Sequence, residues 1–221
     1  MKSAGQFLNN LKTQLIKINP NRPALSTLKK TADLVKAGGL VVLPTDTVYG
    51  LVCDATNIKA VKKLFQVKKR PLTQPLSIAV SKNRDIKKYT IDFTDNAGKL
   101  ARKFLPGPLT IVLKKSSLIP DIVTSGRDDI GIRIPDSKIV LMLIELTKRP
   151  IVIPSANVHN HPSPTTAGQA LKDLNGKVDL ILDGGKTRYG RESTIVSLIN
   201  GKTKILREGA ISTEEILSCI K

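Results

Sequence analysis

One stretch near the start of the chain constrains the fold most. Residues 40–43, Leu-Val-Val-Leu, form an unbroken apolar run, which is typical of a strand covered on both faces. Pro44 has no N–H to donate and is expected to end this strand. Two threonines, an aspartate and a tyrosine follow in residues 45–49. Because ligands bind at the carboxyl ends of strands in such sheets, we predict one wall of a site here. A turn with local side-chain hydrogen bonds is the alternative.

Composition favours one large α/β domain. The chain has 221 residues, of which 3% are aromatic and none is Trp, so its core must be aliphatic. Its formal charge of +18 would attract phosphates or an acidic partner. Three Tyr and four Phe are too few to stack single-stranded nucleic acid. Any RNA contact would therefore be made to phosphates.

Cysteine usage and hydropathy predict a soluble cytoplasmic protein. Cys53 and Cys219 lie far apart and are expected to be free thiols in a reducing compartment. No secretory apolar block opens the chain, and no apolar run approaches the roughly 20 residues of a membrane span. His159 and His161 are close together but have no third ligand nearby, so we predict no metal site.

Hydrophobic periodicity predicts strands and helices along the whole chain. Helices are expected from Ser26, as the cap, to the glycines at 38–39, and at 57–68, 94–104, 137–147, 167–174 and from 212 or 213 onward. Strands are expected at 15–18, 40–43, 76–80, 109–113, 130–135, 151–154, 178–182, 195–199 and 204–207.

Two cationic features point to an anionic ligand. Lys68, Lys69 and Arg70 stand at the end of a predicted helix, just before Pro71, where they either complement the helix dipole or face a ligand. Arg133 alternates with isoleucines on a predicted strand, so its side chain needs an anion or a group of carbonyls. An edge strand with this arginine in water is the alternative.

A second apolar strand also ends at a proline and opens into small polar residues, Ser155-Ala156-Asn157. The loop then runs to Thr166, which is predicted to cap the next helix. Hydroxyl groups before a helix N-terminus suit a phosphate, so we predict the second wall of the site here. Residues 186–191 are polar, contain Gly190 and are predicted to form a mobile loop that could act as a lid.

Seven short motifs together resemble the YrdC-like family of threonylcarbamoyl-AMP synthases, and they occur in family order over about residues 13–218. They are Pro44-Thr45-Asp46-Thr47-Val48-Tyr49-Gly50-Leu51, Lys68-Lys69-Arg70-Pro71, Pro106-Gly107-Pro108-Leu109-Thr110, Arg133-Ile134-Pro135, Pro154-Ser155-Ala156-Asn157, Glu192-Ser193-Thr194 and Leu206-Arg207. The resemblance implies a twisted mixed parallel and antiparallel sheet, flanked by helices, with a large concave basic surface. It also implies a single-domain member, with an N-terminal extension at 1–12 and a catalytic domain at 13–221.

The resemblance implies an activity. L-threonine, bicarbonate and ATP would give threonylcarbamoyl-AMP and pyrophosphate, the first step toward the threonylcarbamoyl modification of a tRNA adenosine beside the anticodon. ATP is a substrate here, and Mg²⁺ would be held mainly by its phosphates. Downstream partners would be the tRNA threonylcarbamoyltransferase machinery and possible tRNA or double-stranded RNA, with no membrane.

The family's functional residues carry over by position. Catalysis would involve Lys68, Arg70 and Arg133. Threonine contacts would fall on Thr47, Arg133, Ile153 and Ser193. ATP contacts would fall on Lys68, Arg70, Gln74, Asp129, Ser155, Asn157, Ser163 and Arg207.

Two positions depart from the family pattern. Ala79 stands where long members have a histidine near threonine, and Asp129 stands where they have a threonine near the nucleotide. The sequence therefore leaves open that the chain is a relative that acts on another carbamoylated substrate. It also leaves open a basic RNA-binding module of the same fold without threonine-dependent turnover, which would bind RNA with a steep salt dependence.

Overall fold

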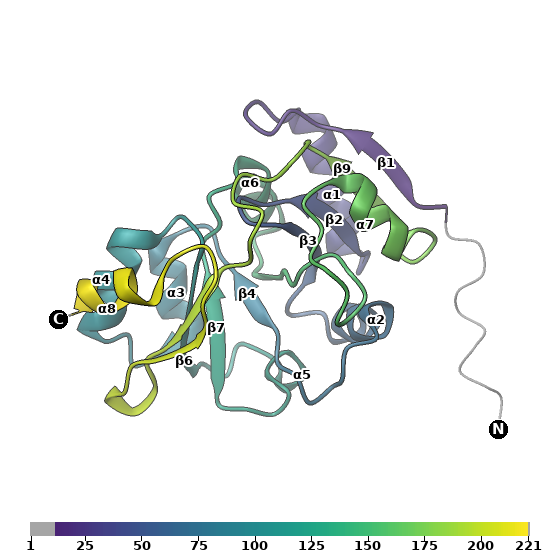
Figure 1. Ribbon diagram of the computed structural model, residues 1–221. Coiled ribbons are helices and arrows are strands. Elements are labelled where there is room, and N and C mark those ends of the chain that lie inside the picture. Colours follow the sequence, from purple (N-terminus) through teal and green to yellow (C-terminus); the bar gives the residue numbers. More distant parts are fainter. Residues whose placement is uncertain (1–11, 221) are drawn as a thin grey trace, which may run out of the picture.

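The computed structural model describes residues 12–220, which form one eleven-stranded mixed sheet with helices on both faces (Figure 1). The strands are β1 (Gln14–Lys17), β2 (Val41–Pro44), β3 (Tyr49–Asp54), β4 (Ser77–Ala79), β5 (Thr90–Ile91), β6 (Leu109–Lys115), β7 (Asp129–Arg133), β8 (Ile151–Val152), β9 (Leu180–Asp183), β10 (Thr194–Ser197) and β11 (Lys204–Arg207). The helices are α1 (Leu25–Lys36), α2 (Ile58–Lys68), α3 (Asn83–Tyr89), α4 (Asp95–Phe104), α5 (Asp121–Thr124), α6 (Lys138–Thr147), α7 (Ala167–Leu174) and α8 (Thr213–Ile220), with a 3₁₀ turn η1 (Ile199–Gly201).

The sheet combines parallel and antiparallel pairs, as the sequence predicts. Its strand order is β1-β9-β2-β3-β8-β4-β7-β6-β10-β11, and β5 pairs with β6. Four of these pairs are parallel: β1 with β9, β9 with β2, β4 with β7, and β6 with β10. Because β6 runs antiparallel to β7, the end of β7 lies beside the starts of β6 and β10. This arrangement brings loops from distant parts of the chain together.

Strand β2 is buried on both faces. Val41 and Leu43 of β2 pack in the cluster formed with α1 and α6, while Leu40 and Val42 belong to the larger cluster that includes α2 and α7. The buried core is largely aliphatic, as the composition predicts. Figure 1 shows α4 and α8 side by side at the C-terminal end, where they contact each other. Among the described residues, no helix is long and apolar enough to cross a membrane.

Most predicted elements are present, with some corrections. β2 includes Pro44, which still pairs with Tyr49, so residues 45–48 are the turn of a β2–β3 hairpin. The strand β3 is not predicted, nor are the short elements α3, β5 and α5. Ser26 lies in the first turn of α1 but is not its cap; the N-cap is Ala24, without a side-chain bond. The expected extension at 1–12 lies outside the described residues except for Lys12.

Tyr49 connects β3 to the loop after β9. Its hydroxyl donates to the carbonyl of Gly185 at 2.7 Å and accepts from the N–H of Gly184 at 3.2 Å. Burial raises the pKa of Tyr49 to about 12, so the hydroxyl stays protonated and can donate. The phenol, which the sequence placed in the site wall, therefore anchors the neighbouring loop.

Tyr49→Phe is expected to lower the free energy of unfolding by about 1–2 kcal/mol, because it leaves two loop backbone groups without their partner. The measurement is urea denaturation followed by circular dichroism. Tyr189→Phe is the matched control: its exposed hydroxyl contacts only Arg188 among the described residues, and its loss should change stability by no more than about 0.5 kcal/mol. Equal effects of the two variants would contradict this role for Tyr49.

Candidate active site

A cavity of about 180 Å³ lies where seven chain segments meet. Its walls come from the β2–β3 turn, the loop after α2 with the start of β4, the start of β6, the end of β7, the segment after β8, the start of β10 with the residues before it, and the end of β11. Seven of the residues that the resemblance singles out line it: Thr47, Arg70, Arg133, Ile153, Ser155, Ser193 and Arg207. The two proline-ended strands of the sequence prediction thus contribute to one site.

Arg133 is buried at the end of β7, in the middle of the sheet. Its Nε donates to the carbonyl of Gly107 at 2.9 Å, Nη1 to the hydroxyl of Thr47 at 2.9 Å, and Nη2 to Oδ1 of Asp46 at 2.6 Å. Asp46 supplies an anion and Gly107 supplies a carbonyl, which confirms the prediction that this arginine needs an anion or a carbonyl. A guanidinium has five N–H groups, so one remains on each terminal nitrogen. Burial lowers the pKa of Arg133, and the Asp46 carboxylate opposes this effect.

Hydroxyl groups surround this arginine. Thr47 Oγ1 lies 2.9 Å from Oγ1 of Thr45. On the other side, Ser193 Oγ lies 2.9 Å from Oγ1 of Thr110 and 3.3 Å from Nη2 of Arg207. Arg207 also donates to the Ser193 carbonyl, which fixes its guanidinium beside β10. The result is a polar pocket that offers an arginine and several hydroxyls to a small ligand.

Lys68 is buried at the end of α2, and its ammonium hydrogen-bonds to Ser155 and Asn157 in the second wall of the site. Nζ donates to the carbonyls of Ser155 and Asn157 and to Oδ1 of Asn157. Three acceptors are all satisfied only by the protonated amine. Burial and the nearby charge of Arg70 nevertheless lower the pKa of Lys68 to about 7. An incoming anion would relieve this unfavourable burial of charge.

Arg70 follows α2 after Lys69, whose left-handed backbone ends the helix. Arg70 Nε donates to the Gln74 carbonyl at 3.1 Å, and Nη2 donates to the Pro75 carbonyl at 2.9 Å. These bonds hold the guanidinium in the pocket wall, where burial and the charge of Arg207 lower its pKa. Gln74, predicted as an ATP contact, thus orients Arg70 through its backbone and does not itself line the cavity.

The remaining predicted nucleotide residues lie in two separate hydrogen-bonded groups. Ser155 Oγ donates to Oδ1 of Asn157 at 2.6 Å, and Nδ2 of Asn157 donates to the His161 carbonyl. Ser163 Oγ donates to Oε1 of Glu192 at 2.6 Å. Thr166 caps α7 in a capping box with Gln169, as predicted.

Loop 186–191 is attached to the site by its backbone. The N–H groups of Thr187, Tyr189 and Gly190 donate to the carbonyls of Thr165, Asp46 and Thr47 respectively. Arg188 adds an ion pair with Asp136 at 2.8 Å. In this structure the loop lies against the β2–β3 turn, and its opening as a lid stays a prediction.

Lys68, Gln74, Asn157 and Ser163 do not line the cavity, but each hydrogen-bonds to a residue that does. Asp129 neither lines the cavity nor bonds through its side chain to a residue that does. It begins β7, four residues before Arg133 at the opposite end of the strand, and its carboxylate is held by Arg127 at 2.7 and 2.8 Å. A nucleotide contact at Asp129 is therefore corrected. Ala79, the other departure, ends β4 beside Arg133 and is buried in the core formed with α6.

Sequence reasoning missed the carboxylate of Glu192, the hydroxyl of Thr110 and the pairing of the predicted Asp46 carboxylate with Arg133. All three stand inside the quoted motifs, but their roles depend on pairings across the sheet. Among the residues that the structure describes, no group of three His, Cys, Asp or Glu could hold a metal ion.

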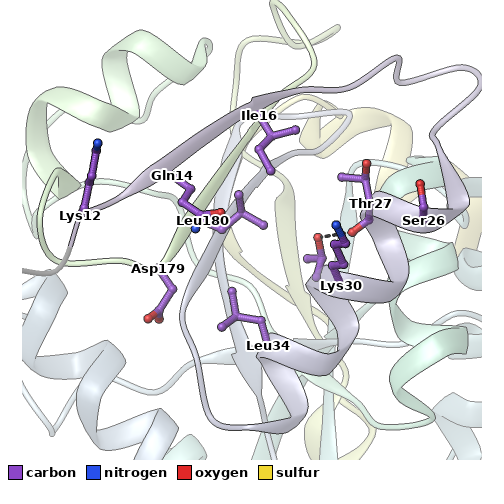
Figure 2. Close-up of a pocket in the computed structure, with 10 residues that line it drawn as sticks. Lys12, Gln14, Ile16, Ser26, Thr27, Lys30, Leu34, Asp179 and Leu180 are labelled. Atoms are coloured by element: carbon purple, nitrogen blue, oxygen red, sulfur yellow. Dashed lines mark hydrogen bonds between the residues drawn. The ribbon is translucent and has the colours of Figure 1, made fainter.

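A larger cavity, about 430 Å³, lies between β1 and α1 at the edge of the sheet (Figure 2). Lys12 and Lys30 lie at separate places along it, and Thr31 donates to the Thr27 carbonyl. It offers neither an arginine nor a converging set of strand ends. The smaller cavity is therefore the better candidate for chemistry.

Comparison with known proteins gives consistent matches. A family model for Sua5, YciO and YrdC proteins, described as "Telomere recombination", matches residues 33–209. The threonylcarbamoyl-AMP synthase of Pyrococcus abyssi is 42% identical over 86% of this chain, which spans only 56% of that protein. The putative threonylcarbamoyl-AMP synthase of Methanocaldococcus jannaschii is 41% identical over 95% of this chain and 99% of its own length.

Solved structures agree with the fold. The crystal structure of P. abyssi Sua5 complexed with L-threonine superposes with a TM-score of 0.91 at 40% identity, covering 94% of this chain and 61% of that one. The crystal structure of Escherichia coli YciO gives a TM-score of 0.85 at 23% identity over 92% of this chain and 99% of its own, a likeness of fold alone.

Proposed function

The chain belongs to the Sua5/YciO/YrdC family, and on that premise we propose that it is a nucleotidyltransferase making threonylcarbamoyl-AMP and pyrophosphate from L-threonine, bicarbonate and ATP. The observation that carries this proposal is the buried Arg133, held beside the Thr47 hydroxyl with two N–H groups to spare, in the same cavity as Arg70 and Arg207. This is a site for an amino acid carboxylate next to a site for phosphates.

At the threonine end, the free N–H groups of Arg133 would bind the carboxylate in a bidentate manner. Thr47 and Ser193 would offer hydroxyls to the same ligand. The backbone near Ile153 closes this side of the cavity, opposite Gly50, where an added methyl group would lie 2.5 Å from the Ile153 side chain. These contacts suit a small zwitterion that carries its own hydroxyl.

At the nucleotide end, the chemistry demands positive charge. The threonine amine and bicarbonate form a carbamate with loss of water and of the ammonium proton, and a carbamate oxygen then attacks the α-phosphorus of ATP while pyrophosphate leaves. Carbamate formation adds a second negative charge beside the threonine carboxylate, and this dianion must approach an anionic nucleotide. Lys68, Arg70 and Arg207 would offset the repulsion and hold the reacting atoms in line. No covalent enzyme intermediate is needed.

The other proposed nucleotide contacts are Ser155, Asn157, Ser163 and Gln74, the last through its effect on Arg70. Mg²⁺, when bound, would neutralise the leaving pyrophosphate, with the phosphates and water as its main ligands. The cavity lining offers one carboxylate, Glu192, whose two oxygens are already engaged by Ser163 and Arg207. Because this carboxylate is already engaged, the site fits an Mg²⁺ ion that arrives bound to the nucleotide.

The product implies partners and a location. We propose that residues 13–221 form the catalytic domain, that it acts in the cytoplasm, and that its product passes to a tRNA threonylcarbamoyltransferase. The net charge of +18 suits an encounter with tRNA or double-stranded RNA through phosphates. The alternative of an RNA-binding module without turnover gains no specific support from the cavity, whose buried arginine and hydroxyls suit a small substrate.

The test is pyrophosphate release from ATP by the purified protein with bicarbonate. Release should depend on L-threonine, and serine or valine in its place should give much less, because each lacks part of the threonine side chain. Equal release with all three amino acids would remove threonine specificity and favour a relative with another carbamoylated substrate. Release without any amino acid would contradict the synthase.

The buried ammonium of Lys68 makes nucleotide binding pH-dependent. Its pKa is about 7 in the free protein, and a bound anion raises it, so the complex holds more protons than the free protein above that pH. ATP affinity should therefore fall by up to about tenfold per pH unit from pH 7.5 to 9.5. Calorimetric titration at constant ionic strength measures this, with Lys68→Arg as the comparison, because an arginine stays protonated throughout. An equal decline in both proteins would exclude Lys68 as the cause.

A further inference from the structure

Glu192 occupies a central place in the cavity that the proposed reaction does not explain. Its carboxylate accepts from Ser163 through Oε1 and forms an ion pair with Arg207 through Oε2. Both partners are residues to which the proposed function assigns the nucleotide. A phosphate cannot take the Ser163 hydroxyl proton or this N–H of Arg207 while the carboxylate holds them.

The charges of the cavity make this arrangement unusual. Among the described residues that line it, Glu192 is the one acidic side chain. Arg133 has its own buried partner, Asp46. Lys68 and Arg70 bond to neutral oxygens, and the negative charge of Glu192 raises the pKa of both. Glu192 therefore acts on the whole group of cations that phosphates would need.

The side chain can leave without disturbing the fold. The Glu192 backbone is anchored, since its carbonyl accepts from the N–H of Ala210 at 2.9 Å, and Gly209 packs closely against it. The side chain, by contrast, is 34% exposed toward the cavity. A cavity of about 180 Å³ is also small against the roughly 300 Å³ or more of common ligand sites, so something must move for a nucleotide to enter.

We propose that Glu192 is a resident anion in the phosphate subsite: it holds Arg207 and Ser163 in the empty enzyme, is displaced when a nucleotide phosphate binds, and competes with bound pyrophosphate for the same donors. This inference rests on the proposed function and adds a specific determinant of affinity to it. The free carboxylate keeps two donors in place and lowers the affinity for phosphate ligands. When the carboxylate returns to Arg207 and Ser163, it favours the release of pyrophosphate.

The experiment is calorimetric titration of inorganic pyrophosphate and of ATP into the wild-type protein and Glu192→Gln, with EDTA and again with Mg²⁺. The amide keeps the shape and removes the competing charge, so both ligands should bind about tenfold more tightly, with or without the metal. Glu192→Ala should shift affinity in the same direction, which guards against a defect peculiar to the amide. Adenosine, which carries no phosphate, should bind with equal affinity to the wild-type protein and to both Glu192 variants.

Glu208→Gln is the matched control. Glu208 directly follows Arg207, is exposed, and bonds to Thr213 outside the cavity, so its neutralisation should leave both affinities unchanged. Unchanged or weaker pyrophosphate binding in Glu192→Gln would overturn the proposal, and weakening only with Mg²⁺ would identify a metal ligand instead. If the wild-type protein binds ATP and makes the adenylate while Glu192→Gln binds no differently, this inference fails and the proposed function stands.

Discussion

Arg133→Lys is expected to lower kcat/KM for threonine by about two to three orders of magnitude, because it removes the fork that would bind the carboxylate. Arg133 donates three of its five N–H groups to Gly107, Thr47 and Asp46. A lysine keeps the charge but cannot hold these partners and a carboxylate together. Steady-state kinetics with threonine varied at saturating ATP measures the effect, and the KM for threonine should rise more than that for ATP.

The chain provides a matched control for this substitution just before the other end of β7. Arg127 makes a bidentate pair with Asp129 at the surface, outside the cavity. Arg127→Lys should therefore leave kcat/KM for threonine nearly unchanged. Similar kinetics for Arg133→Lys and the wild-type protein, or a loss confined to the KM for ATP, would contradict a carboxylate site at Arg133.

Arg70→Ala is expected to reduce threonine-dependent pyrophosphate release by about 10²–10³-fold, the loss typical of removing one preorganised donor from developing charge. Two backbone carbonyls aim the Arg70 guanidinium into the cavity beside Arg207. Removing it takes away a cation that the approach of two anions requires. The measurement is the rate of pyrophosphate release at saturating threonine and ATP.

Lys69→Ala is the control for Arg70→Ala, because Lys69 is adjacent and exposed but does not line the cavity. RNA binding provides a second measurement. The loss of one surface contact would weaken RNA binding only slightly, and uniformly across RNA sequences. Arg70→Ala should therefore lose turnover while keeping most of its RNA affinity. The opposite result, full turnover with lost RNA affinity, would favour the RNA-binding module.

Much of the fold follows from local patterns. The apolar runs at β2 and β9, the alternation in β7 and the amphipathic spacing of α2 and α7 each predict an element that the structure contains. Strand β3 is not predicted because a polar turn precedes it and a glycine stands at position 50. Gly50 is needed there for a packing reason: its missing side chain makes room for Ile153.

The site was partly predictable for a related reason. Strand ends with small polar residues were recognised, and the order of the motifs supported their convergence. Pairing across the sheet could not be read from the chain, so the Asp46–Arg133 and Glu192–Arg207 pairs emerged only with the structure. Asp129 lies outside the quoted motifs, and the chain alone does not tell which end of its strand faces the cavity.

The most direct test of the central claim is to follow carbon-labelled bicarbonate in a reaction with L-threonine, ATP and the purified protein. The account predicts that label appears in a single adenylate, in step with the pyrophosphate released, and that omitting threonine abolishes both. Release of pyrophosphate with no label in an adenylate, or label incorporated without threonine, would contradict it.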